Sequence, residues 1–209
     1  MSEPDPGERG LTGQTDRRGG RRNRVYVVNS FPEVRIIADR LVIRELGPQD
    51  VTLVGEVLSA GEPEALSPGT PSQAEDHPGW LADGIHRHRR DGGGVHLAML
   101  ARGGDRIIGG ISLFHTDWEV RSAEIGYGVR SDERGNGYAT EALVAVSRWA
   151  LTTGGMQRVW LTANVDNTAS ARVAEKSGFH REGTLRRAAA EADGLHDQAV
   201  FSLLDDEVD

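Results

Sequence analysis

The chain has no cysteine among its 209 residues, and Lys176 is the one lysine among its 24 basic residues. The missing cysteine excludes disulfides, thiolate metal sites and a cysteine nucleophile. No apolar run approaches the ~20 residues that span a bilayer. The N-terminus also lacks the apolar stretch of a secretory signal. We therefore expect a soluble protein with no membrane segment, located in the cytoplasm.

The charge balance is acidic, with 32 Asp and Glu against 24 Lys and Arg and a net charge of -8. Proteins that bind nucleic acids present a positively charged surface to the phosphates, so this acidic balance argues against a nucleic-acid partner. A surface with net negative charge attracts cationic ligands more than anionic ones. The composition, 37% apolar and 27% charged, is that of a globular chain.

The first 24 residues differ from the rest in composition. They carry almost no apolar side chains and hold six Arg against four acids. Such a segment cannot offset its ordering entropy by burial, so we predict a disordered tail at 1–24 and one domain at 25–209. The four arginines at 17, 18, 21 and 22 could touch RNA or an acidic partner, and a solvated tail is the favoured alternative.

Periodicity predicts the elements of the domain. Strands are expected at 25–29, 34–38, 40–44, 95–101, 107–115, 123–129, 158–163, 184–188 and 198–204. Helices are expected at 48–58 and 81–90, across Ala142 to Ala150 and at 168–177, and an irregular loop at 61–79. This order predicts a single α/β structure with a mixed sheet.

A glycine-rich loop between the predicted strand 123–129 and the following helix is the most informative segment. Glycine lets a backbone approach an anion, and the first N–H groups of a helix are unpaired donors at its positive end. The loop therefore predicts a phosphate cradle. It lacks the Gly-Lys-Ser/Thr of a P-loop and the spacing of a dinucleotide fingerprint.

Arg134-Gly135-Asn136-Gly137-Tyr138-Ala139 resembles the acetyl-CoA loop of the GNAT superfamily of N-acetyltransferases. Further matches precede and follow it: Ala123-Glu124-Ile125-Gly126-Tyr127, then Asn164, Asn167, Ser170 and Glu175-Lys176-Ser177-Gly178-Phe179. The segments around 183–186 and 201–204 look like the closing hairpin of the RimJ/RimL-like branch. The resemblance covers about 40–207.

The resemblance implies a GNAT-like mixed, splayed central sheet of six or seven strands flanked by about four helices. It implies acetyl-CoA as co-substrate, no metal, and direct transfer of the acetyl group to a primary amine. The acceptor would be a protein N-terminus or a small cationic amine, and a homodimer is compatible with it. The alternative is a non-catalytic CoA or acyl-CoA binding module that keeps the fold.

Two residues are expected to take part in catalysis, one as a base and one as a proton donor. The acceptor ammonium must lose a proton before it attacks, and Glu124 is the predicted base because alternation places it on the same face as Gly126. Asp117 and Glu119 are reserve candidates. Relatives often protonate the leaving thiolate with a tyrosine at the position of Ala174, so Ser170, one turn earlier, is the predicted donor here.

The residues expected to bind the CoA moiety lie on both sides of the gap that the family opens between two neighbouring strands of its splayed sheet. Val129 should offer backbone hydrogen bonds to pantetheine. The pyrophosphate loop comprises Arg134, Gly135, Asn136, Gly137, Tyr138, Ala139 and Thr140. Asn164 and Asn167 should pair with pantetheine amides, and Asn167 should also cap the next helix.

Histidines and tryptophans elsewhere are weaker candidates. His86 and His88 would diverge on a helix, so no metal site is expected there. His77, Trp80 and Trp118 match segments that line the acceptor side in relatives, and ordinary packing explains them equally well.

Overall fold

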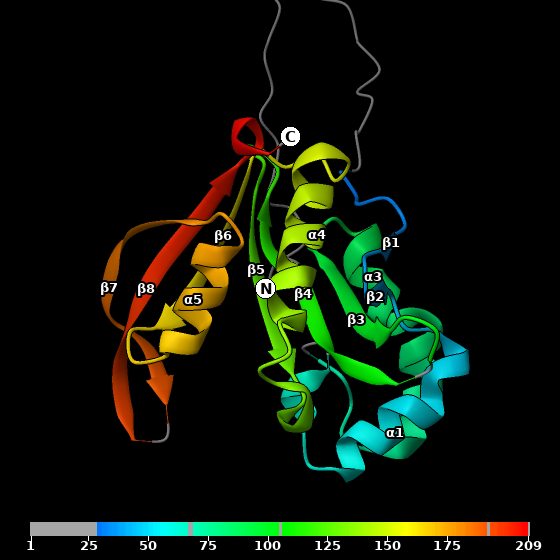
Figure 1. The fold of residues 1–209 in the computed structure, drawn as a ribbon. Helices are drawn as coiled ribbons and strands as arrows, with labels where there is room; N and C mark the ends of the chain where they lie inside the picture. The colour runs from blue at the N-terminus through cyan, green and yellow to red at the C-terminus, as the bar shows by residue number, and fades with distance from the viewer. Residues whose placement is uncertain (1–28, 67–68, 105, 192, 209) are drawn as a thin grey trace, which may run out of the picture.

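A computed structural model describes residues 29–66, 69–104, 106–191 and 193–208. Within these ranges eight strands form one sheet in the order β1-β2-β3-β4-β5-β6-β8-β7 (Figure 1). Their bounds are β1 (Arg35–Ile37), β2 (Leu41–Arg44), β3 (Val95–Ala101), β4 (Ile107–Asp117), β5 (Ser122–Val129), β6 (Arg158–Asn164), β7 (His180–Glu191) and β8 (Gly194–Leu204). Strands β5 and β6 are parallel, and the other neighbours are antiparallel.

The mixed α/β class is therefore confirmed. The sheet has more strands than the six or seven expected, because the short lead-in strand β1 and both arms of the C-terminal hairpin join it. The predicted tail at 1–24 and most of the predicted strand at 25–29 lie outside the described residues.

The helices are α1 (Val51–Ser59), α2 (His77–Gly79), α3 (Ile85–Arg90), α4 (Tyr138–Thr152) and α5 (Thr168–Lys176). The helix predicted at 81–90 begins as a π-helix, Trp80–Gly84, before α3. The predicted loop at 61–79 contains two short 3-10 turns, Pro63–Ala65 and Ala74–Asp76, in its described part. None of the described helices is long and apolar enough to cross a membrane.

Each face of the sheet has its own apolar core. Helices α4 and α5 cover one face, and α1 and α3 lie on the other (Figure 1). Strand β3 serves both cores by alternation: Leu97 and Met99 pack on the α4 side, whereas Ala98 and Leu100 pack on the α1 side. A central strand that is buried on both faces holds its neighbours β2 and β4 in a fixed place, and through β4 it fixes β5.

Candidate active site

Strands β5 and β6 separate in the middle of the sheet. Their parallel pairing runs from Ser122↔Arg158 to Glu124↔Trp160 and then stops. Beyond Glu124, β5 keeps β4 as its partner and β6 keeps β8. Figure 1 shows the two halves of the sheet diverging there. The opening exposes backbone groups of β5 that an extended ligand can pair with.

The predicted phosphate cradle lies where β5 leads into α4. Gly135 and Gly137 both have a φ of +81°, a left-handed conformation that favours glycine. Gly137 occupies the N-cap position of α4, so the first N–H groups of this 15-residue helix face out of the turn. A Cβ at Gly135 would meet nothing within 4 Å, so the space above the turn is open. These features suit an anionic group.

The other predicted members of the loop make contacts that hold its shape. The Arg134 side chain donates from Nε to the Val129 carbonyl at 3.0 Å, which closes the turn after β5. The Asn136 amide donates to the Glu133 carbonyl at 3.1 Å. Tyr138, Ala139 and Thr140 form the first turn of α4. These side chains stabilise the turn, and the groups it leaves for the predicted anion are the backbone N–H groups at the start of α4.

Of the two predicted asparagines, Asn164 ends β6 and Asn167 lies in the segment that leads from β6 into α5. Asn167 caps α5, since its Oδ1 accepts the Ser170 N–H at 3.0 Å, which confirms its predicted capping. The Asn164 amide donates to Glu191 at 3.1 Å, and its Oδ1 accepts the Asp166 N–H at 3.0 Å. Both asparagines thus fix the segment between β6 and α5, and their pairing with pantetheine stays a prediction.

Glu124 lies at the point where β5 and β6 part. Its carboxylate is 12% exposed. One oxygen lies 2.8 Å from Nδ1 of His115, and the other accepts the Thr162 hydroxyl at 3.4 Å. His115 is 73% exposed, so the pair joins a nearly buried carboxylate to the solvent. This arrangement can take up a proton inside the site and release it outside.

Sequence reasoning missed His115. In β4, Phe114 is the partner of Glu124, so strict alternation would send His115 to the other face. The register shifts after Phe114, and His115 has a φ of +49°, which redirects its side chain toward the carboxylate. A bulge of this kind leaves little trace in the sequence.

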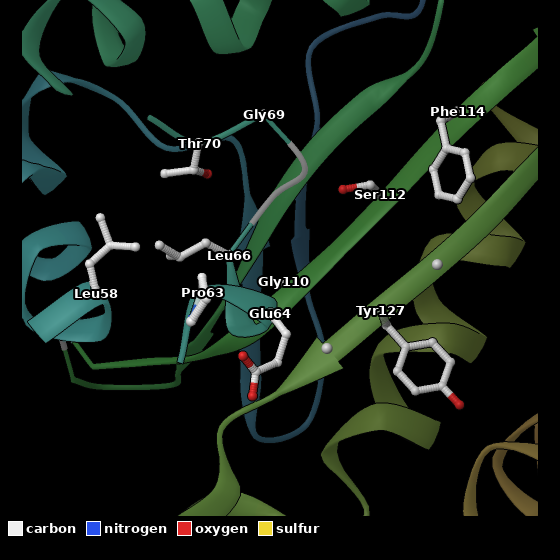
Figure 2. Close-up of a pocket in the computed structure, with 12 residues that line it drawn as sticks. Leu58, Pro63, Glu64, Leu66, Gly69, Thr70, Gly110, Ser112, Phe114 and Tyr127 are labelled. Carbon is white, nitrogen blue, oxygen red and sulfur yellow. The ribbon is translucent and has the colours of Figure 1, made fainter. Parts of the chain in front are cut away.

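Tyr127 of β5 has a buried hydroxyl and lies near Ser170 of α5. Figure 2 shows the Tyr127 ring turned away from the cavity described below. Burial raises the pKa of Tyr127, and the neighbouring Ser170 hydroxyl partly opposes that shift. Ala174, the position where relatives carry a tyrosine, is fully buried in the core. The predicted donor Ser170 therefore has a phenol beside it from another element, which sequence spacing did not indicate.

A cavity of about 410 Å³ opens on the face of β4 and β5 that Glu124 shares (Figure 2). The 12 residues that line it are mostly small or apolar: Leu58, Pro63, Glu64, Leu66, Gly69, Thr70, Gly110, Ser112, Phe114, Gly126, Tyr127 and Gly128. Gly110, Gly126 and Gly128 contribute no side chains, and the backbone of 64–66 packs closely on Gly110 and Gly128. Glu64 is the one carboxylate among these 12. Such a space suits a slender chain with few charges.

The wall of this cavity is part of the predicted loop at 61–79. A Cβ at Gly128 would lie 1.8 Å from the Glu64 carbonyl, so the turn Pro63–Ala65 rests directly on β5. Glu62 fastens the turn to the segment after β5, since it accepts the Ser131 N–H at 2.9 Å and the Ser131 hydroxyl. These two bonds lower the pKa of Glu62. Glu62 thus joins the cavity wall to the segment that leads from β5 into the predicted cradle.

Other sequence candidates have structural contacts. Asp117 accepts the Glu119 N–H at 2.9 Å in the turn between β4 and β5. Trp118 donates to the Gly92 carbonyl at 2.8 Å, and the His77 ring lies 2.9 Å from the Pro71 carbonyl. Trp80 packs in the second apolar core. None of these side chains is among the described residues that line the cavity.

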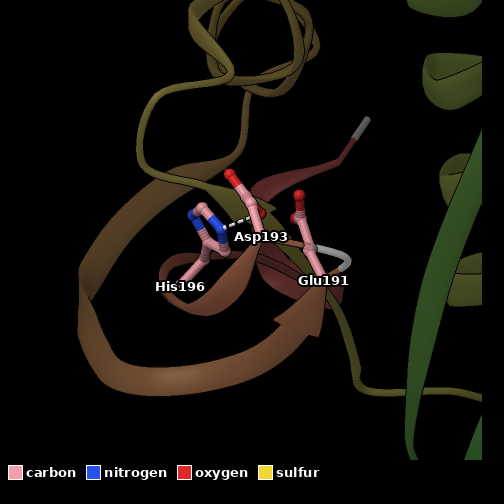
Figure 3. A group of neighbouring side chains, drawn as sticks. All are labelled: Glu191, Asp193 and His196. Atoms are coloured by element: carbon pink, nitrogen blue, oxygen red, sulfur yellow. Dashed lines mark hydrogen bonds and ion pairs between the residues drawn. The ribbon is translucent and has the colours of Figure 1, made fainter.

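Three side chains at the tip of the β7–β8 hairpin could hold a metal ion (Figure 3). One ligand atom each of Glu191, Asp193 and His196 lies within 4.8 Å of the other two. His196 lies 2.7 Å from Asp193, which raises the pKa of the imidazole, and Glu191 accepts the Asn164 amide. None of the three is among the described residues that line the cavity, so we assign the trio no part in the reaction.

Comparison with known proteins gives consistent matches. A family model described as an acetyltransferase (GNAT) domain matches residues 40–180. The putative ribosomal N-acetyltransferase YdaF of Bacillus subtilis (strain 168) is 29% identical over 178 residues, which cover 80% of this chain and 93% of that protein. The crystal structure of a probable acetyltransferase, 29% identical, superposes with a TM-score of 0.70 over 83% of this chain and 98% of the other.

A more distant match shares the fold. The structure of RimL, a ribosomal L7/L12 alpha-N-protein acetyltransferase in complex with coenzyme A, is 20% identical. It superposes with a TM-score of 0.66 over 81% of this chain and 96% of that one.

Proposed function

This chain belongs to the GNAT family of acetyltransferases, with ribosomal N-acetyltransferases of the RimJ/RimL-like branch among its relatives, and we propose that it acetylates a primary amine with acetyl-CoA. The observation that carries the proposal is the combination of the open β5–β6 splay with the left-handed glycine turn at its end. An activated acetyl thioester is what acetyl-CoA supplies when bound. The remaining steps rest on this chain's own residues.

The cradle residues Arg134, Gly135, Asn136, Gly137, Tyr138, Ala139 and Thr140 would hold the pyrophosphate through backbone N–H groups. The edge of β5 that β6 leaves after Glu124 would bind the pantetheine amides as far as Val129, whose carbonyl also accepts the Arg134 Nε, with Asn164 and Asn167 on the opposite side. The space above Gly135 fits an anion, and the crystal form of RimL named above contains coenzyme A.

Glu124 removes the proton that the acceptor ammonium must lose. Its carboxylate lies on the cavity face, and His115 links it to the solvent. The neutral amine nitrogen then attacks the thioester carbonyl carbon, a C–N bond forms and the C–S bond breaks. The proton taken by Glu124 leaves through His115, so the base is restored without moving the acceptor.

Ser170 donates its hydroxyl proton to the departing thiolate and takes up the proton that the acylated nitrogen releases, so its hydroxyl is restored. Tyr127 lies beside it and stays protonated at neutral pH, because burial raises its pKa. The pair therefore presents a proton source on the α5 side of the splay, opposite Glu124. A separate base and acid on two sides of one opening suit a direct transfer.

The acceptor we favour is the amino terminus of a polypeptide. Among the 12 described residues that line the cavity, Glu64 is the one with a charge, whereas a polyamine or an aminoglycoside carries several ammonium groups that need several carboxylates. A peptide brings one ammonium and an extended backbone without further charges, which suits a cavity lined mostly by small and apolar residues. The relative YdaF carries a name that points to ribosomal acceptors.

Calorimetric titration with acetyl-CoA tests the proposal, followed by thiol release with N-terminal peptides, polyamines and aminoglycosides. Binding with turnover on peptides is the expected result. Turnover on a small amine alone would replace the acceptor class and keep the reaction. Binding with no acetyl transfer to any acceptor would favour the non-catalytic binding module instead.

A further inference from the structure

Arg40 joins the start of β2 to the start of α4, although Arg40 and Glu141 are 101 residues apart in the chain. Its Nε donates to one Glu141 oxygen at 2.8 Å, and its backbone N–H donates to the other at 2.7 Å. The Leu41 N–H adds a third bond at 3.2 Å. Glu141 is 14% exposed, so these donors compensate a carboxylate that is largely removed from water.

The same guanidinium reaches the glycine turn. Its Nη1 donates to the Asn136 carbonyl at 2.8 Å. Its central carbon lies 4.7 Å from the centre of the Tyr138 ring, within cation–π range. A Cβ at Gly137 would lie 3.6 Å from Nη2. Arg40 therefore spans the turn from the residue before the N-cap to the residue after it.

These contacts matter because of what a bound anion requires. A phosphate needs N–H groups facing it, and a free carbonyl or a carboxylate at the same place repels it. Glu141 lies in the first turn of α4, where its charge competes with an external anion for the positive end of the helix. Arg40 engages the Asn136 carbonyl and balances the Glu141 charge at once.

We propose that Arg40 is a positioning residue for the turn at 134–140, and that it neutralises Glu141 so that the turn accepts the pyrophosphate of CoA. This inference rests on the proposed function. It predicts that the charge of Glu141 weakens CoA binding only when Arg40 is removed.

A double-mutant cycle tests this coupling. Calorimetry gives the Kd of CoA and of 3′-dephospho-CoA for the wild type, R40Q, R40K, E141Q and R40Q/E141Q. We expect R40Q to bind both ligands about tenfold more weakly, and R40K to lose less because it keeps the charge. E141Q should recover most of the loss in the R40Q background and change little alone. R87Q removes an exposed arginine of α3 and is the matched control, with wild-type affinity expected.

Hydrogen exchange without ligand gives an independent readout. Backbone amides at 135–141 should exchange faster in R40Q than in the wild type, because the turn loses its link to β2. Unchanged exchange at 135–141 in R40Q would overturn the positioning role. An equal effect of E141Q on the Kd of CoA in the wild-type and R40Q backgrounds would also overturn it. Loss of CoA affinity without loss of 3′-dephospho-CoA affinity would overturn the pyrophosphate assignment. A wild type that binds no CoA, with R40Q still exchanging faster, would contradict the proposed function and leave the positioning role supported.

Discussion

Glu124 Oε2 and His115 Nδ1 lie 2.8 Å apart, at the point where the paired part of β5 and β6 ends. One member of the pair is nearly buried and the other is mostly exposed. The contact exists because a bulge in β4 gives His115 a left-handed backbone, which turns its ring toward the site. A proton removed next to the cavity therefore has a short route to the solvent.

Glu124→Gln should lower the rate of acetyl transfer by about 100-fold or more, since a general base contributes that much. The loss should be largest below the pKa of the acceptor amine, where the base is most needed. The Kd of acetyl-CoA should stay unchanged, because Glu124 does not belong to the cradle. A variant with the wild-type pH–rate profile would remove Glu124 as the base.

His115→Gln separates proton release from proton removal. We expect a smaller loss of rate than in Glu124→Gln, together with partial rescue by small imidazole buffers that carry the proton out. Thr116→Ala changes the next residue, whose hydroxyl donates to the Gly93 carbonyl away from Glu124, and is the matched control. Equal rates with and without buffer in His115→Gln would argue against the relay.

Gly135→Val should weaken acetyl-CoA binding by at least about tenfold, since a β-branched residue resists a left-handed backbone and fills the open space above the turn. Gly103→Val is a closely matched control. Gly103 has a φ of +85° and, like Gly135, no atom within 4 Å of an added Cβ, but it lies in the turn between β3 and β4. We expect the two variants to lose similar amounts of Tm. Acetyl-CoA binding should weaken in Gly135→Val alone. Equal binding by the two variants would refute the cradle.

Gly128→Ala should displace the turn Pro63–Ala65, because the new Cβ would overlap the Glu64 carbonyl. We expect Tm to fall by several degrees and the KM of the acceptor to rise. Gly183→Ala, on β7 with no atom within 4 Å of the added Cβ, should change neither. An unaltered acceptor KM in Gly128→Ala would mean that the turn does not form the acceptor wall.

His96 makes the fold sensitive to acid. Burial and the stacked ring of His88 lower the pKa of His96 from 6.5 to about 4. In that interval the unfolded chain binds a proton that the folded chain does not, so the free energy of unfolding should decrease as the pH falls from 6.5 toward 4. Denaturant titrations should show a flatter pH dependence in His96→Gln than in the wild type or in His180→Gln, an exposed control. The same slope in all three would contradict the assignment.

The features that could be predicted from the sequence are those that local chemistry decides. The glycine turn, the cap at Asn167 and the face of Glu124 follow from left-handed glycines, side-chain capping and strand alternation, each within a few residues. The splay followed from the family resemblance. The elements around 95–101 and 158–163 were recognised by their apolar patterns.

The features that were missed depend on distant partners. The hydrogen bond from Ser131 to Glu62 joins residues 69 apart in the chain, and the hydrogen bond from Arg40 to Glu141 joins residues 101 apart. Tyr127 meets Ser170 only because β5 and α5 face each other across the splay. His115 needed a bulge that reverses the expected face. No local pattern fixes contacts of these kinds before the topology is known.

A crystal structure of the protein with acetyl-CoA bound is the most direct test of the account. It should show the pyrophosphate at the N–H groups of 135–140, pantetheine along β5 between the two halves of the sheet, and the thioester next to the cavity on the side of Glu124. Acetyl-CoA bound elsewhere, or a thioester that points away from Glu124, would contradict it.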